Sequence, residues 1–304
     1  MKDIVVVGGG PAGLTAAVYG CRSGASVTVI EKNVFGGQIV NSPKVENIPG
    51  FAEISGDVFA DQMLEQVMKQ GAEIAFDEVI GAEKTDAGFK VTTASGEIYE
   101  SKALILATGT THRTLGLPGE ENLIGNGISF CAVCDGDFYR DKTVVMIGGG
   151  NSAFVESSLL TEIVSKLIIL QDMPFFTAEQ AIQDQVLSSP NVESHVGTKI
   201  LGYEVVDGVL KGVRYEEAGE EKIAECDGVF LAVGLVPEND NFKDIADIDE
   251  RGYLIAASEN CNISKTSGIF VAGDCRAKTL RQVATACSDG AYAAIEACNY
   301  IKSL

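Results

Sequence analysis

The sequence lacks tryptophan, has only two histidines and carries few basic residues for its length of 304. Lysine and arginine number 23 against 43 aspartate and glutamate residues, so the net charge is −20. A chain this acidic has no basic face that could displace the counterions of a nucleic acid, which excludes nucleic acid as a partner. Hydrophobic residues make up 46% of the chain. This share excludes a disordered chain and indicates a well-buried α/β protein.

Long apolar segments are also missing. No stretch reaches the ~20 apolar residues that a membrane-spanning helix needs. The first residues lead directly into a short apolar segment at 4–7, without the basic region and cleavage site of a signal peptide. We therefore expect a cytoplasmic protein that does not interact with membranes. In that compartment most of the eight cysteines should be free thiols, and a disulfide is more often catalytic than structural.

Only one close cysteine pair exists, in the segment Cys131-Ala-Val-Cys134-Asp135-Gly136. Two thiols this close on a helical turn can form a disulfide and reopen it, and a helix N-terminus stabilises the attacking thiolate. Asp135 follows directly and can exchange a proton with that thiolate. Half of a zinc site has the same spacing, but a zinc site needs four ligands and the other six cysteines are scattered. We interpret the pair as a redox-active disulfide and expect no metal.

The N-terminal segment has the order strand, glycine-rich turn, helix and strand. Residues 4–7 are a continuous apolar run, which is typical of a buried parallel strand. A G-x-G-x-x-G turn follows at residues 8–13. Its glycines turn the chain, let the backbone approach a pyrophosphate and let the helix pack on the strand. Glu31 ends the next strand, where its carboxylate suits a ribose and would repel a 2′-phosphate, so this segment predicts an adenine dinucleotide site.

A second copy of this pattern begins at residue 143. Residues 143–147 are predicted to form a strand, residues 148–150 the glycine-rich turn, and residues 166–170 the next strand. The spacing is close to that of the first copy, so we expect a second dinucleotide-type fold rather than an unrelated domain. Turn signals at 207–208 and 218–219 predict two hairpins. The predicted fold class is therefore α/β, with two Rossmann-like domains.

Two further apolar strands end in small residues, one at 104–109 and the other at 269–274. A small-residue end allows a bound ring system to approach closely. Asp274 lies beside a tight turn, where a carboxylate suits the hydroxyl of a polyol. The helix predicted from about 281 to 300 offers amide N–H groups and a positive dipole end to an electron-rich ring edge.

Together these motifs resemble the low-molecular-weight thioredoxin reductases over nearly the whole chain. The matching segments are Gly8-Gly-Gly-Pro-Ala-Gly13, Gly36-Gly-Gln38, Glu46-Asn-Ile-Pro-Gly50, Ala107-Thr-Gly109, Cys131-Ala-Val-Cys-Asp-Gly136, and Ala272-Gly-Asp274 with Leu280-Arg-Gln282. The combination is specific, although each segment alone is not. The resemblance implies an FAD domain made of residues 1–113 and 241–304, a nucleotide-binding-like domain of residues 114–240 inserted into it, and a homodimer.

The resemblance also implies roles for individual residues. Cys134 would face the flavin, Cys131 would attack the disulfide of thioredoxin, and Asp135 would supply the proton. The FAD contacts would come from Gly8, Gly10, Pro11, Ala12, Gly13, Glu31, Lys32, Gly37, Gln38, Asn47, Ala107, Thr108, Gly109, Gly273, Asp274, Arg281, Gln282 and Val283. Because flavin and thioredoxin need the same sulfur pair, the inserted domain should rotate about its connections near residues 110–117 and 237–243.

The inserted domain departs from the family pattern where NADPH would bind. NADPH-dependent members usually follow the second strand with His-Arg-Arg and a further Arg, which pair with the 2′-phosphate. Here residues 170–176 read Leu-Gln-Asp-Met-Pro-Phe-Phe, and the closing Gly-His-x-Pro motif is replaced by Gly-Leu-Val-Pro at 234–237. Residues 143–239 contain five basic and fifteen acidic side chains. A dianionic phosphate has no evident partner there, and Asp172 would repel it.

Three interpretations of the electron donor stay open. The inserted domain could bind NADH, with Asp172 on the ribose as Glu31 is in the first copy. It could bind a second flavin, or it could bind no nucleotide, with electrons reaching the FAD from ferredoxin. The third is similar to the ferredoxin-dependent flavin thioredoxin reductases of clostridia, and we favour it. A docking patch for an acidic ferredoxin could come from Arg276, Lys278 and Arg281, or from Arg113, Arg140 and Lys142.

Other functions also fit the motifs. An NADH- or NADPH-dependent thioredoxin reductase is the alternative within the same class. From different classes, the chain could be a flavoprotein redox sensor, with the cysteine pair as a signal, or a flavin-dependent oxidase of small dithiols. Turnover that depends on thioredoxin distinguishes the reductase from both.

Overall fold

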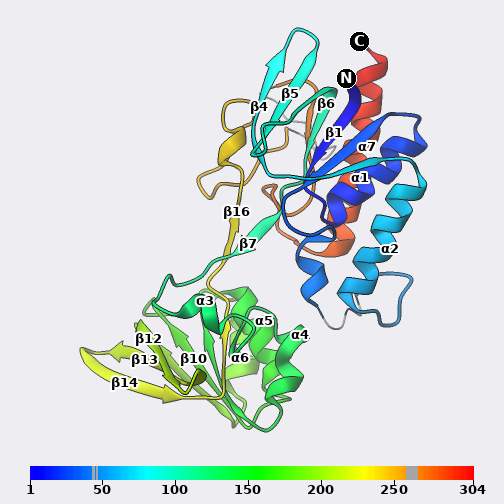
Figure 1. Ribbon diagram of the computed structural model, residues 1–304. Coiled ribbons are helices and arrows are strands. Elements are labelled where there is room, and N and C mark those ends of the chain that lie inside the picture. Colours follow the sequence, from blue (N-terminus) through cyan, green and yellow to red (C-terminus); the bar gives the residue numbers. More distant parts are fainter. Residues whose placement is uncertain (43–44, 46, 258–265) are drawn as a thin grey trace. The chain divides into compact units, whose positions relative to one another are not determined.

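The computed structural model describes residues 1–42, 45, 47–257 and 266–304. Glu46 of the predicted loop motif and Cys261 lie outside the described residues. The chain forms two compact units (Figure 1). Unit 1 comprises Met1–Thr111 and Val236–Leu304, and unit 2, His112–Leu235, is inserted between these two parts in the sequence.

Unit 1 is built on a seven-stranded sheet, in which five strands run parallel in the order β3-β2-β1-β6-β17. The antiparallel hairpin of β4 and β5 pairs with the first half of β6. The strands are β1 (Lys2–Val7), β2 (Val27–Glu31), β3 (Glu73–Phe76), β4 (Val79–Thr85), β5 (Gly88–Thr93), β6 (Ile98–Leu106) and β17 (Ile269–Val271). β1 and the second half of β6 are continuous apolar runs because apolar clusters cover both faces of the sheet.

Small residues bring the helices of unit 1 close to one another. The helices are α1 (Pro11–Arg22), α2 (Gly56–Lys69) and α7 (Val283–Lys302), with 3₁₀ turns η1 (Gly37–Asn41) and η3 (Asp240–Phe242). Figure 1 shows α7 beside α1. A Cβ atom at Gly290 of α7 would lie 2.1 Å from the carbonyl oxygen of Ala12 in α1, so this approach requires glycine.

Unit 2 is built on a five-stranded sheet whose strands all run parallel, in the order β11-β10-β9-β15-β8. Its elements are α3 (Glu120–Leu123), β8 (Ile128–Ser129), α4 (Ala132–Asp135), η2 (Gly136–Tyr139), β9 (Thr143–Ile147), α5 (Asn151–Leu160), β10 (Lys166–Gln171), α6 (Gln180–Leu187), β11 (Val192–Val196) and β15 (Gly228–Leu231). A separate antiparallel sheet contains β12 (Lys199–Val206), β13 (Val209–Glu217) and β14 (Glu220–Glu225).

Alternate residues of the central strands of unit 2 face two different layers. Val144 and Met146 of β9 pack in a cluster with α4, α5 and α6, whereas Val145 and Ile147 pack in a cluster with β13 and β14. Since side chains alternate along a strand, covering both faces demands an unbroken apolar run. The predicted α/β class with two Rossmann-like sheets is confirmed.

The two connections between the units are β7 (Thr110–His112) and β16 (Leu235–Pro237), which pair as a two-stranded sheet. Residues 112–113, predicted to belong to the FAD domain, lie in unit 2, and residues 236–240, predicted to belong to the inserted domain, lie in unit 1. Asn239 explains the second difference, because its buried amide donates to the carbonyl oxygens of Gly252 and Cys275 and its amide oxygen accepts from the hydroxyl of Thr108. Among the helices of the described part of the chain, none is long and apolar enough to cross a membrane.

Candidate active site

A disulfide joins Cys131 and Cys134 in unit 2, as the sequence analysis predicted. Cys131 caps the N-terminus of the short helix α4. The amide N–H of Cys134 donates a hydrogen bond to the sulfur of Cys131 over 3.2 Å. A donor aimed at a sulfur stabilises its thiolate form once the disulfide is reduced. This hydrogen bond therefore favours Cys131 as the sulfur that carries the negative charge.

Asp135, the predicted proton donor, is held beside the disulfide by Ser129. The hydroxyl of Ser129 donates to Oδ2 of Asp135 over 2.5 Å and accepts from the amide N–H of Cys131 over 3.1 Å. Ser129 ends β8 and is 5% exposed, so its hydroxyl is fixed by its surroundings. One buried hydroxyl thus connects the backbone of Cys131 to the carboxylate of Asp135. The sequence analysis missed Ser129, because a single serine before a cysteine pair carries no recognisable signal.

A second carboxyl group, Glu156 of α5, also contacts the cysteine helix. Its Oε2 accepts a hydrogen bond from the amide N–H of Ala132 over 3.2 Å. Burial raises the pKa of Glu156 to about 7, and the hydrogen bond from Ala132 opposes this shift. The sequence analysis missed Glu156, since only the packing of α5 against α4 brings it to the cysteine pair. A group with this pKa changes its protonation near neutral pH.

The first glycine-rich turn, in unit 1, has the tight backbone that its motif predicts. Gly8 has φ of +105°, and a Cβ atom there would lie 2.2 Å from the carbonyl oxygen of Ala107. A Cβ atom at Gly13 would lie 1.9 Å from the carbonyl oxygen of Gly8. At Gly10, by contrast, the nearest atom to such a Cβ is the carbonyl oxygen of Gly36, 4.0 Å away. The backbone is thus crowded at Gly8 and Gly13 and open at Gly10, where α1 begins, as a pyrophosphate site requires.

Glu31 points its carboxylate back at this turn. Its Oε2 accepts from the amide N–H of Gly9 over 2.6 Å, and its Oε1 accepts from that of Asn33 over 2.8 Å. The carboxylate is therefore fixed at the end of β2, where a ribose hydroxyl can donate to its remaining lone pairs. Lys32, also predicted to contact FAD, instead forms an ion pair with Glu238.

The Oδ1 oxygen of the Asp274 carboxylate is buried. This Oδ1 lies 3.2 Å from Nζ of Lys278 as an ion pair. Burial raises the pKa of Asp274, and Lys278 opposes the shift. A carboxylate oxygen has more than one lone pair, so it can also accept from the hydroxyl of a bound polyol chain. Arg281 lies nearby, donates to the carbonyl oxygen of Asp274 and stacks its guanidinium 4.1 Å from the ring of Tyr253.

The remaining predicted FAD residues lie in loops that hydrogen bonds hold together within unit 1. Asn47 donates to the side chain of Gln282 over 3.0 Å, and Gln282 caps the N-terminus of α7 directly before Val283. Gln38 donates to the carbonyl oxygen of Thr110. Two further glycines among the predicted FAD contacts lie close to a neighbouring residue, Gly37 to Gly10 and Gly273 to Ala12. A Cβ atom at Gly109 would have open space.

These residues fit FAD in its three recognisable parts. The open start of α1 suits the pyrophosphate, the fixed carboxylate of Glu31 suits the adenosine ribose, and the buried Oδ1 of Asp274 suits the flavin's polyol chain. All of them belong to unit 1. When bound there, FAD would supply the capacity to store and pass on electrons.

The second glycine-rich turn, in unit 2, is closed by a different side chain. Gln171 ends β10 as Glu31 ends β2, and it is 5% exposed. A Cβ atom at Gly149 would lie 2.6 Å from the side-chain carbon of Gln171. Asp172, which the NADH interpretation placed on the ribose, is one residue further along and exposed. The position that corresponds to Glu31 therefore holds an uncharged amide.

Three of the five basic residues between positions 143 and 235 form ion pairs with acidic side chains. Lys166 forms an ion pair with Glu193, and Lys222 with Glu217, both over 2.6 Å. Arg214 pairs with Glu204 over 2.9 Å. Lys166 begins β10, whereas the turn faces the other end of that strand. Lys199 is exposed and follows Thr198, whose amide N–H and hydroxyl donate to the carbonyl oxygen of Gln171, so it is the basic residue nearest to this end of β10 in sequence and pairing.

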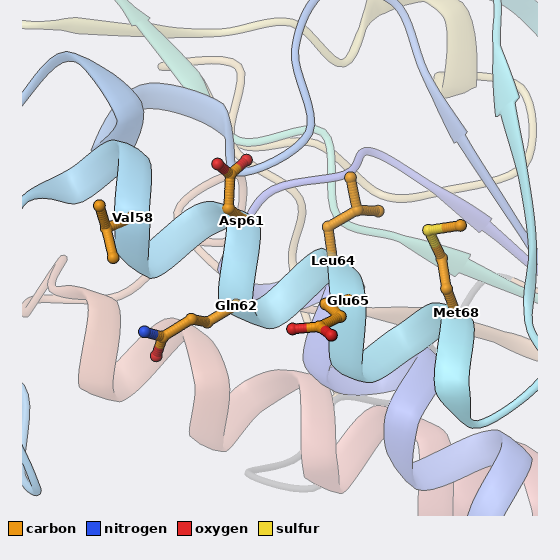
Figure 2. A pocket seen from close by; sticks show the side chains of 6 residues that line it. All are labelled: Val58, Asp61, Gln62, Leu64, Glu65 and Met68. Atoms are coloured by element: carbon orange, nitrogen blue, oxygen red, sulfur yellow. The ribbon is translucent and has the colours of Figure 1, made fainter.

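A shallow pocket of about 400 Å³ lies along α2 (Figure 2). Its lining consists of side chains from this one helix: Val58, Asp61, Gln62, Leu64, Glu65 and Met68. Figure 2 shows Asp61 and Leu64 on one side of the helix and Gln62 and Glu65 on the other. None of these is a predicted site residue. A pocket without converging groups from a second element provides no constellation for chemistry.

Comparison with known proteins agrees with this geometry. The sequence profile of the pyridine nucleotide-disulphide oxidoreductase family matches residues 2–290. The thioredoxin reductase of Treponema pallidum is 40% identical over 306 residues, which cover 99% of this chain and 98% of that protein. The crystal structure of Lactococcus lactis thioredoxin reductase matches with a TM-score of 0.81 at 34% identity and covers 100% of both chains. That of T. acidophilum thioredoxin reductase matches with a TM-score of 0.78 at 37% identity.

Proposed function

Because the chain belongs to the pyridine nucleotide-disulphide oxidoreductases, among the thioredoxin reductases, we propose that it passes electrons from reduced ferredoxin through FAD and the Cys131–Cys134 disulfide to oxidised thioredoxin. Thioredoxin reduction follows from the family, which uses FAD. The choice of ferredoxin is the specific part of the proposal. The observation that carries it is the second glycine-rich turn, where uncharged Gln171 fills the space beside Gly149.

The proposed roles of the cysteines follow from their hydrogen bonds. Cys131 attacks the thioredoxin disulfide as a thiolate, which the amide N–H of Cys134 stabilises. Cys134 then attacks the sulfur of Cys131 in the mixed disulfide, which breaks the bond to thioredoxin, releases the thioredoxin sulfur and restores the Cys131–Cys134 bond. Asp135, held by Ser129, supplies the proton that a leaving sulfur needs.

The docking of an acidic ferredoxin needs a local basic patch on this acidic chain. In the first predicted set, Arg276 and Lys278 both pair with Asp289 and are little exposed, and the guanidinium of Arg281 lies over the ring of Tyr253. The second set consists of exposed side chains in unit 2, Arg113, Arg140 and Lys142, of which Arg140 forms an ion pair with Asp137. We therefore favour the second set as the docking patch.

An anaerobic titration tests the donor. The purified protein is mixed separately with NADPH, NADH and reduced ferredoxin, and bleaching of the flavin absorbance is followed. We expect rapid, stoichiometric bleaching with ferredoxin alone. Rapid bleaching by NADPH or NADH would refute the proposed donor and leave thioredoxin reduction intact. Charge reversal at Arg113, with Arg251 of unit 1 as the matched exposed control, tests the docking patch.

The other open points stay proposals. We propose a homodimer on the basis of the family resemblance, and sedimentation of the purified protein tests it. A redox sensor would show a reversible disulfide without catalytic reduction of thioredoxin. Multiple turnovers per flavin with thioredoxin as the acceptor would exclude that function.

A further inference from the structure

Asp289, in the second turn of α7, is an acidic residue to which the reaction described above gives no role. Its side chain is 14% exposed and contacts the turn that holds Asp274. We propose that Asp289 is a positioning residue for the flavin: it holds Lys278 and Arg276 beside Asp274, and its negative charge keeps the reduction potential of bound FAD low. This inference rests on the proposed function only through the FAD site at Asp274, and it holds for any electron donor.

Small residues bring Asp289 to this turn. The next residue, Gly290, lets α7 approach α1, since a Cβ atom there would lie 2.1 Å from the carbonyl oxygen of Ala12. Gly273 has φ of +83° and also packs on α1, because a Cβ atom there would lie 2.8 Å from that of Ala12. The amide N–H of Gly273 donates to Oδ2 of Asp289 over 3.0 Å. This hydrogen bond attaches the turn before Asp274 to α7.

Two cations with little exposure also bind Asp289. Nη1 of Arg276 lies 2.7 Å from Oδ1 of Asp289, and Nζ of Lys278 lies 3.0 Å from Oδ2. Nζ of Lys278 is also 3.2 Å from Oδ1 of Asp274, so one ammonium group bridges two carboxylates. The side chains of Arg276 and Lys278 are only 12% and 13% exposed, so water screens their charges little. Asp289 therefore holds the ammonium group of Lys278 at Asp274.

The same ammonium group also reaches the start of α7. Nζ of Lys278 donates to the hydroxyl of Thr285 over 3.4 Å. Thr285 forms a capping box with Gln282, the residue that precedes α7. Gln282 and Asp274 are both predicted FAD contacts. Lys278 thus connects the surroundings of two predicted FAD contacts, which places the charges that Asp289 binds next to the flavin site.

The charges at this turn influence how readily the flavin takes up electrons. Reduction with two electrons and one proton leaves a flavin one unit more negative, so a nearby cation stabilises the reduced form and a nearby anion disfavours it. The acids at this turn are Asp274 and Asp289, and the cations are Arg276, Lys278 and Arg281. Removing the negative charge of Asp289 should therefore raise the reduction potential. Removing the positive charge of Arg276 should lower it.

Equilibration of the FAD-loaded protein with a dye of known potential tests this role. Dithionite reduces protein and dye together in the absence of oxygen, and the absorbance gives the reduced fraction of each. Asp289→Asn keeps an oxygen that accepts hydrogen bonds but loses the charge. It should shift the equilibrium toward reduced flavin by roughly three- to tenfold.

Three further variants complete the test. Arg276→Gln should shift the equilibrium in the opposite direction, and the double variant should lie close to the wild type because the two lost charges cancel. Glu296→Gln is the matched control and should equal the wild type. Glu296 belongs to the same helix, about 10 Å further along its axis.

Equal potentials in the wild type and Asp289→Asn would overturn the proposal. Shifts of both single variants in the same direction would also overturn it, because a general disturbance of the site does not follow the sign of the removed charge. If Asp289→Asn does not retain FAD, Arg276→Gln still decides, since an unchanged or raised potential there contradicts the proposal. These measurements use neither ferredoxin nor thioredoxin. A failure of ferredoxin to reduce the flavin would therefore count against the proposed donor, whereas unchanged potentials would count against the role of Asp289.

Discussion

Removing the hydroxyl of Ser129 should weaken both the fold of unit 2 and the chemistry of its disulfide. In Ser129→Ala the amide N–H of Cys131 loses its acceptor and the carboxylate of Asp135 loses its donor. A buried donor without a partner costs about 1–3 kcal/mol, and a hydrogen bond to a charged group contributes about 1.5–3 kcal/mol. Asp135 is only partly buried, and water can replace part of what it loses. We expect a fall of about 2 kcal/mol in the free energy of unfolding.

Ser157→Ala is the matched control for this prediction. Ser157 is fully buried in the same unit, and its hydroxyl has no hydrogen-bond partner among the described residues. Removing it should change the free energy of unfolding by less than about 0.5 kcal/mol or increase stability, because no bond is lost.

Urea denaturation and thioredoxin turnover measure the two effects of Ser129→Ala. The urea midpoint should fall for Ser129→Ala and stay constant for Ser157→Ala. Turnover should fall roughly tenfold or more, since a misplaced proton donor loses part of its contribution to the rate. If Ser129→Ala unfolds at the same urea concentration as Ser157→Ala and keeps full turnover, the hydroxyl does not position Asp135.

Three further predictions concern other parts of the molecule. Gly13→Ala should lower the flavin content of the purified protein several-fold, read from its visible absorbance, because the added Cβ would lie 1.9 Å from the carbonyl oxygen of Gly8. Asp3→Asn should lower the free energy of unfolding at pH 7 by about 1 kcal/mol, a value that already allows for solvent screening. Thermal unfolding should show this loss as a lower melting temperature. Hydrogen bonds, first of all from Lys102, lower the pKa of Asp3 from 3.8 to about 2. The stabilisation is therefore present above pH 3.8 and is lost as the pH falls toward 2. If Asp3→Asn destabilised the protein as much at pH 2 as at pH 7, this account would be wrong. Cys131→Ser should keep donor-driven flavin bleaching and lose thioredoxin turnover by at least ~100-fold, and normal turnover would remove Cys131 from the reaction.

Local patterns predicted the parts of the fold that short sequence segments determine. Residues 4–7 of β1 and 144–147 of β9 are unbroken apolar runs, and Gly8, Gly13 and Gly148 must be glycine because main-chain atoms leave no room for a side chain. The disulfide was equally predictable, since its two cysteines are three positions apart. By contrast, the edge strand β11 reads Val-Glu-Ser-His-Val, and its three central residues are polar, so the sequence has no apolar run that would indicate a strand. An edge position leaves polar residues in solvent and removes the apolar signal.

Contacts between distant segments account for what the sequence analysis missed. Glu156 reaches Ala132 from 24 residues away, and no spacing rule links the two. The unit boundary shifted because Asn239 bonds to Thr108, Gly252 and Cys275, all remote in sequence. At the second turn, the sequence analysis considered Asp172 for the ribose, whereas the side chain at the end of β10 is that of Gln171. Successive side chains of a strand point to opposite faces, so a prediction that is wrong by one residue places the side chain on the wrong face.

The order of elements along the chain determines when each unit can fold during synthesis. Every strand and helix of unit 2 has left the ribosome once residue 235 is free, so this unit can form while translation continues. Unit 1 begins earlier but finishes last, because β17 and α7 complete its sheet and cover α1. Until those residues emerge, the apolar side chains of α1 that pack against α7 have no partner. We therefore expect cofactor loading to follow the synthesis of β17 and α7.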